Sequence, residues 1–356
     1  MMIANFFPLE SLYPERYNHT RMLKSNLISV LRKTWNRRLN RLEWRLTRPV
    51  LRSLPPIVFV EPTNLCQLKC ALCPSGMRQI KPLGRMSMDT FRKVIDSLGP
   101  TATKLHLYNW GEPFLHPDLP EMITYAKRFG PYVVVSTNLN KLDEDTAKAI
   151  IGARLDFLNA SIDGVSQQVY ESYRISGNIE RVIENLRMLC RLKQEARSDL
   201  PRIDWQFLVT AQNEAELPEA ARLAEELGVR FHPKKIRIGL SEFDTESGAE
   251  IASKDKDWIP HDATFNRYKK KKRAKHDACK SLWDRVVVSW QGWIAPCCQV
   301  YKDVHHFSRS FPDDFWSVWN GPEYVAARKL FADGNNSEAK ELDLVCLRCQ
   351  AVGNIL

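Results

Sequence analysis

The chain of 356 residues carries 52 Lys and Arg against 42 Asp and Glu, and 44% of its residues are hydrophobic. These values exclude a disordered chain, a collagen and a small disulfide scaffold, and they allow two domains or one large barrel with an appendage. Most of the net charge of +10 lies in residues 21–52, which hold ten basic residues and one acid. The rest of the chain is nearly neutral, which argues against nucleic acid as a partner.

The sequence places the protein in the cytoplasm. No stretch reaches the roughly 18 apolar residues that a membrane span needs, and the N-terminus lacks the pattern of a signal peptide. Nine cysteines leave one unpaired in an oxidising compartment, and most of them are clustered. This clustering predicts metal ligation in a reducing compartment.

Residues 1–54 form a basic arm with a helical pattern. Its apolar residues recur at spacings of mostly three and four, and Pro49, Pro55 and Pro56 end the pattern. Three uses remain open for the segment 21–52: peripheral contact with the inner membrane surface, nucleic-acid binding, or burial of its leucines against the rest of the chain. The apolar residues are Leu23, Leu27, Val30, Leu31, Trp35, Leu39, Leu42, Leu46 and Val50.

Residues 55–240 alternate short β-branched or aromatic runs with longer helical patterns. Six strands separated by helices predict an α/β fold with a parallel sheet or partial barrel, whose chemistry gathers at the C-terminal ends of the strands. The expected strands are Ile57–Glu61, Leu105–Trp110, Tyr132–Thr137, Phe157–Ile162, Ile203–Val209 and Val229–His232. The expected helices are Met88–Leu98, Leu119–Phe129, Glu144–Ile151, Ile179–Gln194 and Glu214–Leu227.

The remainder divides into a linker and a small domain. Residues 241–275 are polar and include the basic run Lys269–Arg273, which reads as a solvated loop or as a phosphate-binding patch. Residues 276–356 are rich in Trp and Cys and too few for a large core of their own. A domain of this size usually needs a staple such as a metal.

Three cysteines follow the first expected strand of the core. Cys66, Cys70 and Cys73 lie in the segment EPTNLCQLKCALCP. Three thiolates on one tight loop can hold three irons of a [4Fe–4S] cluster and leave the fourth iron open. A closed zinc site would need a fourth ligand close by, and the nearest histidine, His106, lies on another expected strand.

This Cys-x3-Cys-x2-Cys motif resembles that of the radical S-adenosylmethionine (SAM) enzymes. The resemblance implies a partial (β/α)6 barrel over about residues 56–240 and a cluster that binds SAM at its open iron. It also implies an electron donor such as flavodoxin or ferredoxin, and cleavage of SAM to a 5′-deoxyadenosyl radical that abstracts a substrate hydrogen. Leu72 departs from the family, which usually has an aromatic residue before the third cysteine.

Short polar segments at later strand ends resemble the SAM-binding segments of the same family. Taken singly, they also fit an ordinary turn, a helix cap and a surface arginine; in order at successive strand ends they support each other. The resemblance assigns the methionine ammonium to the Gly-Glu-Pro segment, the ribose to the segment after the third strand, and the carboxylate to an arginine. The corresponding residues are Gly111, Glu112, Pro113, Ser136, Asn138, Ser161, Arg174 and Gln206.

A second set of cysteines lies in the last section. Cys279, Cys297, Cys346 and Cys349 resemble the SPASM/twitch extension of radical SAM enzymes and would close one auxiliary [4Fe–4S] cluster. A full SPASM domain has seven cysteines for two clusters. Two alternatives stay open, a structural zinc ribbon and ligation by Cys298 in place of Cys297. We expect Cys190, in a helical pattern, to be a buried apolar residue.

The resemblance implies a radical SAM oxidoreductase. The reaction ranked first is oxidation of a polar small molecule, such as an alcohol on a sugar or aminocyclitol, with the auxiliary cluster as electron acceptor. A peptide- or cell-envelope-modifying enzyme comes second. A non-catalytic, metal-stabilised protein that binds a membrane surface is the alternative from another class, and no catalytic acid or base can be singled out.

Overall fold

A computed structural model describes residues 14–238, 253–266, 279–334 and 336–349 of the chain. The predictions for residues 1–13, most of the linker 241–275 and the basic run Lys269–Arg273 lie outside these residues. The predicted boundaries of the arm, core, linker and small domain stay predictions.

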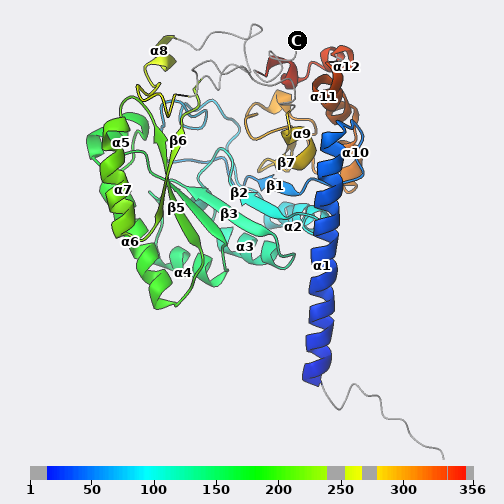
Figure 1. Cartoon of the computed structure of the whole chain (residues 1–356), viewed down its shortest axis with the longest axis horizontal. Coiled ribbons are helices and arrows are strands. Elements are labelled where there is room, and N and C mark those ends of the chain that lie inside the picture. The colour runs from blue at the N-terminus through cyan, green and yellow to red at the C-terminus, as the bar shows by residue number, and fades with distance from the viewer. Residues whose placement is uncertain (1–13, 239–252, 267–278, 335, 350–356) are drawn as a thin grey trace, which may run out of the picture.

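The predicted parallel sheet is confirmed (Figure 1). The strand order is β6-β5-β4-β3-β2-β1-β7-β8, and all neighbours are parallel except β7 and β8. Because β1–β6 follow one another in both sequence and space, their C-terminal ends meet at one edge. The strands are β1 (Ile57–Val60), β2 (Lys104–Leu107), β3 (Tyr132–Thr137), β4 (Phe157–Ser161), β5 (Arg202–Val209), β6 (Arg230–Lys235), β7 (Arg285–Val288) and β8 (Ile294–Ala295).

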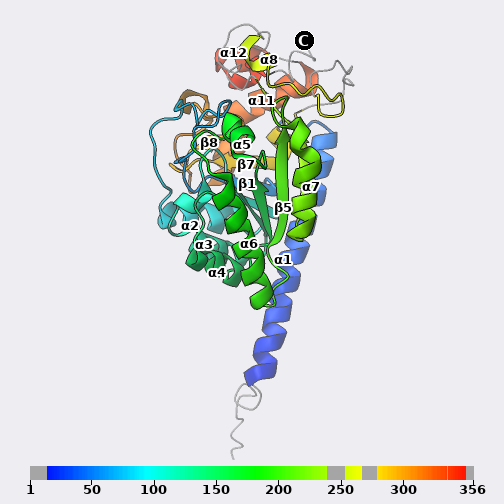
Figure 2. The same ribbon diagram turned by 90° about the vertical axis from the view of Figure 1, so that its left-hand side faces the viewer.

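Amphipathic helices lie around the outside of the curved sheet (Figure 2). Ser87, Asp143, Ser166 and Asn178 cap four of them, each accepting a hydrogen bond from a backbone N–H in the first turn. The helices of the core are α2 (Met88–Leu98), α3 (Leu119–Lys127), α4 (Glu144–Gly152), α5 (Gln167–Tyr173), α6 (Ile179–Glu195) and α7 (Leu217–Glu226). All five predicted helices are present, and α5 is an addition.

The C-terminal section shares the sheet and the core of the barrel. β7 pairs with β1 in register from Ile57 and Arg285, and buried residues of both sections form one continuous hydrophobic cluster. A section too small to bury a core alone thus extends an existing one. Its remaining elements are α9 (Ser281–Asp284), η5 (Asp303–His305), α10 (Phe315–Trp319), α11 (Pro322–Asp333), α12 (Ser337–Glu341) and η6 (Val345–Arg348).

The arm is a single helix, α1 (Pro14–Arg45), whose N-terminal half extends past the rest of the molecule (Figures 1 and 2). Burial of its leucines against the rest of the chain is wrong for Leu31, Leu42 and Leu46, whose exposed fractions are 52–59%. The buried positions are polar instead, because α1 docks through hydrogen bonds. No helix among the described residues is long and apolar enough to cross a membrane.

Part of the predicted linker packs on the barrel. Its described residues, 253–266, include α8 (Ser253–Lys256). Trp258 stacks edge-on against Tyr173 at 5.5 Å between ring centroids, and Ile259 joins the same small cluster, which includes Leu68 and Leu72. This segment therefore lies over the first cysteine loop.

Candidate functional site

The first three cysteines lie on one closed loop after β1. The N–H of Cys73 donates to the carbonyl of Cys70 at 3.2 Å, and the N–H of Met77 donates to the carbonyl of Cys73 at 2.8 Å. A Cβ on Gly76 would lie 2.4 Å from the backbone of Cys70, so only glycine fits there. The sequence reading missed Gly76, which closes the loop on itself.

Burial keeps the thiols of Cys66 and Cys70 protonated in the free chain. Together with smaller contributions from neighbouring cysteines, it raises the pKa of Cys66 to about 12 and that of Cys70 to about 11. Cysteine binds metal as the thiolate, so iron must displace these protons. Three mutually interacting thiols that need a positive charge fit an iron–sulfur cluster.

Three cysteines on one loop match the three protein ligands of a [4Fe–4S] cluster with one open iron. Within the described part of the chain, no three His, Cys, Asp or Glu side chains form a group that could hold one metal ion. The sulfurs around one tetrahedral zinc lie about 3.8 Å apart, given Zn–S bonds of about 2.3 Å. The four irons of a cluster separate their ligands further.

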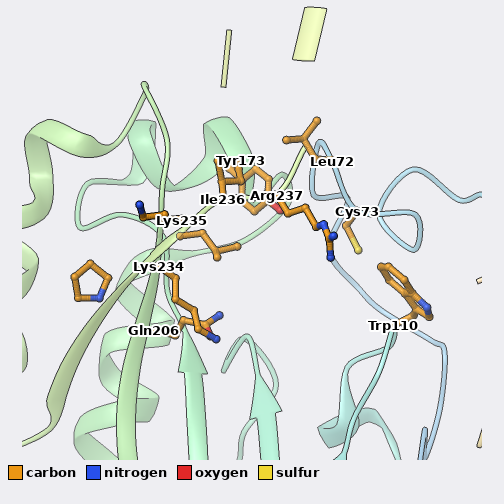
Figure 3. A pocket seen from close by; sticks show the side chains of 11 residues that line it. Leu72, Cys73, Trp110, Tyr173, Gln206, Lys234, Lys235, Ile236 and Arg237 are labelled. Atoms are coloured by element: carbon orange, nitrogen blue, oxygen red, sulfur yellow. The ribbon is translucent and has the colours of Figure 1, made fainter. Parts of the chain in front are cut away.

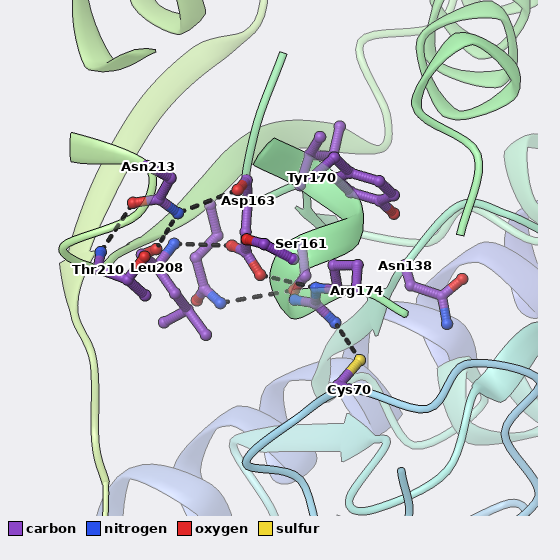
Figure 4. Close-up of polar contacts among 12 residues, drawn as sticks. Cys70, Asn138, Ser161, Asp163, Tyr170, Arg174, Leu208, Thr210 and Asn213 are labelled. Carbon is purple, nitrogen blue, oxygen red and sulfur yellow. Dashed lines mark hydrogen bonds and ion pairs between the residues drawn. The ribbon is translucent and has the colours of Figure 1, made fainter. Parts of the chain in front are cut away.

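Arg174 lies beside the loop, and Asp163 holds its guanidinium in place. Its Nε donates to Asp163 Oδ2 at 2.6 Å, and its Nη1 lies 3.8 Å from the Cys70 sulfur (Figure 4). The other Asp163 oxygen accepts from the N–H of Leu208, and the Asp163 carbonyl accepts from the Asn213 amide. The sequence placed Arg174 here and Asp163 in the segment that ends the fourth strand, but it assigned no role to Asp163.

Glu112 ties two strand ends together. Its carboxylate accepts hydrogen bonds from Thr137 Oγ1 (2.7 Å), the Asn138 N–H (2.8 Å) and the Phe114 N–H (3.2 Å). These bonds occupy most of its lone pairs, and the side chain is buried. The carboxylate thus orients the segment, and Pro113 begins the short η2 (Pro113–Leu115) that follows.

Gly111 is required by a close approach between loops. A Cβ there would lie 2.0 Å from the carbonyl oxygen of Thr63, and the next N–H, of Glu112, donates to the Leu65 carbonyl at 2.7 Å. The segment after β2 is therefore packed directly on the start of the cysteine loop. An ordinary exposed turn does not explain this glycine.

The other predicted polar residues form a row across the ends of β3, β4 and β5. Ser136 Oγ lies 3.3 Å from Ser161 Oγ, and the Gln206 amide reaches Ser161 at 3.5 Å. Asn138 lies at the other end of the row, where its amide nitrogen is 3.9 Å from the Cys66 sulfur and its oxygen accepts from Gln67. All eight predicted SAM-binding residues therefore lie around one edge of the sheet.

A pocket of about 540 Å³ opens beside Cys73 (Figure 3). Leu72, Cys73, Trp110 and Tyr173 line one part, and Gln206 and the end of β6 line the other. The guanidinium of Arg237 points across it toward Cys73 and Trp110 in Figure 3. Lys234 and Arg237 are cations that the sequence reading did not single out, and no acid is among the described residues that line the pocket.

The second group of cysteines also comes together. Burial raises the pKa of Cys346, with further repulsion from Cys279, Cys297 and Cys349, so these four thiols lie within electrostatic reach of one another. Cys298 has other neighbours, Arg285 and Arg237. Cys190 is half-buried against the main core, as an apolar residue would be.

Trp110 connects the pocket to the second group of cysteines. Its indole N–H donates to the carbonyl of Val300 at 3.0 Å, and its ring packs edge-on against Tyr301 at 5.7 Å. Val300 follows Cys297 by three residues, and its own N–H donates to the Cys297 carbonyl. The pocket thus lies beside the first cysteine group, and Trp110 links its wall to the loop of Cys297.

Glu61, at the end of β1, makes the free energy of unfolding depend on pH. It is buried, accepts the Trp110 N–H at 3.0 Å, and burial raises its pKa to about 7 from an ordinary 4.5. The folded chain therefore binds the extra proton between about pH 4.5 and 7, and stability falls as pH rises through this window. We expect Glu61→Gln to restore up to about 3 kcal/mol of the free energy of unfolding that the wild-type chain loses across this window.

Thermal unfolding at pH 5 and pH 8 measures this effect. The Gln variant should melt several degrees above the wild-type chain at pH 8 and at nearly the same temperature at pH 5. Asp143→Asn, at an exposed helix cap whose carboxyl pKa is lowered below its ordinary 3.8 by the Thr146 N–H, is a control that should keep the wild-type difference between pH 5 and pH 8. Equal pH slopes for Glu61→Gln and the wild type would contradict the assignment.

Comparison with known families matches both parts of the chain. Residues 60–224 match the family described as "Radical SAM superfamily". Residues 279–350 match SPASM, described as "Iron-sulfur cluster-binding domain". The two matches contain all seven cysteines of the two groups.

Curated relatives align with part of this chain. Fe-coproporphyrin III synthase of Methanosarcina barkeri is 26% identical over 171 residues, which are 48% of this chain and 41% of the relative. The subtilosin biosynthesis protein AlbA of Bacillus subtilis is 24% identical over 280 residues, 76% of this chain and 60% of the relative. The chain thus spans about half the length of these relatives.

A solved structure shares the fold. SuiB of Streptococcus suis bound to S-adenosylmethionine has a TM-score of 0.59 at 14% identity, covering 98% of this chain and 78% of SuiB. SuiB bound to the precursor peptide SuiA has a TM-score of 0.57 at 13% identity, with 98% and 77% coverage. At this identity the likeness concerns the fold alone.

Proposed function

The chain belongs to the radical SAM superfamily and carries a SPASM-type iron–sulfur domain, and from this we propose that it oxidises a polar small molecule with its auxiliary cluster as electron acceptor. In this superfamily a [4Fe–4S] cluster with bound SAM supplies a 5′-deoxyadenosyl radical that abstracts a substrate hydrogen. The observation that carries the proposal is the pocket beside Cys73, whose wall residue Trp110 is hydrogen-bonded to the loop of Cys297.

Cys66, Cys70 and Cys73 hold the first cluster in this proposal. Arg174 supplies the positive charge nearest to it, which lowers the pKa of Cys70 against the effect of burial. Because Asp163 neutralises one edge of the guanidinium, the other edge remains for the SAM carboxylate. The row of Ser136, Ser161 and Gln206 would receive the ribose.

Glu112 acts through the backbone. Its carboxylate is occupied by protein donors, so the ammonium of SAM would meet the carbonyl groups that Glu112 and Gly111 hold in place. This modifies the role that the family resemblance assigns to Glu112. Its raised pKa, caused mainly by burial, also disfavours the charged form as an ion-pair partner.

The substrate reaction balances with the auxiliary cluster as acceptor. Loss of a hydrogen atom from an alcohol carbon leaves a carbon radical, and loss of one proton and one electron from it gives the carbonyl product. Cys279, Cys297, Cys346 and Cys349 would hold the acceptor. Trp110 joins the pocket to the loop of Cys297, so it marks the route for the electron.

The walls of the pocket favour a substrate with a carboxylate or phosphate group. Lys234 and Arg237 place two cations on one wall, and Lys234 donates to Gln206. A carboxylate or phosphate pairs with these groups, and charge-assisted bonds of this kind are the strong ones. A volume of about 540 Å³ suits a small molecule or one side chain of a larger substrate.

A peptide substrate is the second candidate. AlbA is named for the biosynthesis of subtilosin, and a SuiB structure holds the precursor peptide SuiA. The pocket lies beside the exposed end of β6, where a chain could enter. An acidic side chain of the peptide would then meet Lys234 and Arg237.

Isotope transfer tests the reaction class. The reconstituted chain, with SAM and dithionite, should form 5′-deoxyadenosine, and extract from native cells grown in deuterated medium should place deuterium in it. Fractionation of that extract separates a small molecule from a peptide by size. Formation of 5′-deoxyadenosine with no deuterium transfer from any fraction would oppose substrate oxidation by this route.

Recognition of an anionic group by Lys234 and Arg237 can be tested separately. We expect the stimulating fraction to bind an anion exchanger, and the double variant K234Q/R237Q to need about tenfold more of it for half-maximal deuterium transfer. The control R181Q/R187Q removes two cations from the outer face of α6 and should leave this requirement unchanged. Anion recognition would be contradicted if K234Q/R237Q needed no more of the fraction than the wild type for half-maximal deuterium transfer. It would also be contradicted if the stimulating fraction did not bind the anion exchanger.

A further inference from the structure

α1 is docked through its polar side. The Asn36 amide donates to the Leu54 carbonyl and accepts from the Leu54 N–H, and the Asn40 amide donates to the Trp283 carbonyl at 2.6 Å. Glu43, 1% exposed, accepts from the N–H groups of Arg52 and Ser53 and from the Ser53 hydroxyl. An amphipathic helix of a globular protein usually buries its apolar face instead.

The apolar side of α1 faces outward. Trp35 is 70% exposed, and four further exposed apolar residues fall on the same face at spacings of three, four, seven and four residues, whereas Val30, which is also exposed, lies on another face. Scattered single apolar residues are ordinary on a surface, but a contiguous row marks an interaction site. The row consists of Ile28, Leu31, Trp35, Leu42 and Leu46.

Basic side chains flank this row. Five exposed residues on the same stretch are positive, and the only acid of residues 21–52, Glu43, is buried on the opposite side and occupied by donors. Among residues 28–45, the outward half of the helix is thus apolar and cationic with no acid. The basic residues are Arg32, Arg37, Arg38, Arg41 and Arg45.

The positive charge of α1 distinguishes between the possible partners of this surface. Two copies meeting through α1 would bring two segments of net charge +9 together, and arginines at positions 38 and 45 interrupt the apolar seam that a coiled coil needs. A nucleic acid would use the arginines but not the apolar row. Anionic lipid matches both parts, since arginines reach headgroup phosphates while Trp and Leu enter the interface.

We propose that the outward face of α1 binds an anionic lipid bilayer and holds the enzyme at its surface. The helix extends past the body, so its length is available to a flat surface (Figures 1 and 2). The polar contacts of Asn36, Asn40 and Glu43 fix the body to the other side of the helix. This inference is independent of the reaction and of the substrate.

Vesicle flotation of the reconstituted full chain tests the proposal. We expect binding to phosphatidylcholine vesicles with about 30% phosphatidylglycerol, loss of that binding as salt rises to about 0.5 M, and no binding to phosphatidylcholine alone. R38Q/R41Q/R45Q should bind anionic vesicles about 100-fold more weakly, since each basic residue contributes about fivefold. W35A/L42A/L46A should lose a similar factor.

A triple variant of exposed apolar residues elsewhere is the matched control. L83A/V304A/L342A removes side chains that are 46%, 70% and 39% exposed and should bind like the wild type. Equal binding to neutral vesicles, or unchanged binding by either α1 variant, would overturn the proposal. The proposal would also be overturned if the chain formed a dimer that the substitutions W35A/L42A/L46A dissociate. Binding of duplex DNA or RNA, with no binding to either type of vesicle, would overturn it as well.

Discussion

Replacing Cys66, Cys70 and Cys73 together by alanine should reduce 5′-deoxyadenosine formation at least 1,000-fold, to the background of the assay. These are the three thiols of the closed loop beside the pocket, and burial raises the pKa of Cys66 and Cys70 so that only a bound cation ionises them. Iron should fall from about eight to about four atoms per chain, with half of the visible absorption retained.

Cys190→Ala is the control for this triple variant. Cys190 lies on α6, half-buried against the main core, and its loss should leave both iron and activity unchanged. Iron determination, visible spectra and product analysis on the same preparations compare the variants. Retained cleavage in the triple variant would mean that SAM is cleaved elsewhere, and complete loss of iron would mean that the second site depends on the first.

The barrel could be predicted because its signals are local. β-branched runs such as Tyr132–Thr137 and the periodic pattern of Ile179–Glu195 specify a strand and a helix without knowledge of their neighbours. The Cys-x3-Cys-x2-Cys spacing is likewise local, and it located the centre of the site. The parallel sheet followed from the alternation of strands and helices.

The docking of α1 could not be predicted because its partners are remote. Asn40 donates to the carbonyl of Trp283, 243 positions away, and Asn36 pairs with backbone groups of Leu54. A polar side chain that bonds a distant backbone group looks like any solvated residue in the sequence. The helical pattern was read correctly, and burial of its apolar side, which the usual rule favours, was one of three uses left open.

The roles within the site were missed for the same reason. Glu112 was expected to face the cofactor, and its bonds to Thr137 and Asn138 depend on β2 and β3 being neighbours. Arg237 reaches the pocket from beyond β6, far along the chain from Cys73. Sequence spacing therefore located the residues around the site, and sheet topology decides which of them are free to contact a ligand.

Cys297 and Cys298 are adjacent, yet their replacement should have opposite consequences. Cys297 has Cys279 and Cys349 among its neighbours, whereas the nearest charges to Cys298 are Arg285 and Arg237. We therefore expect Cys297→Ala to lose the auxiliary cluster, about four of the eight irons, and Cys298→Ala to keep all of them. Since SAM cleavage needs only the first cluster, Cys297→Ala should still form 5′-deoxyadenosine while deuterium-labelled substrate is no longer oxidised.

Metal analysis of the matched pair separates the remaining alternatives. One zinc per chain that disappears in Cys297→Ala would identify a structural zinc ribbon. Loss of iron in Cys298→Ala alone would show that Cys298, and not Cys297, is the ligand. The auxiliary cluster would join α9, the loop after β8 and η6, so its loss should also lower the melting temperature of the C-terminal section. A Cys297→Ala chain with eight irons and wild-type stability would contradict the four-cysteine assignment, because a cluster held by those thiols cannot lose one ligand without effect.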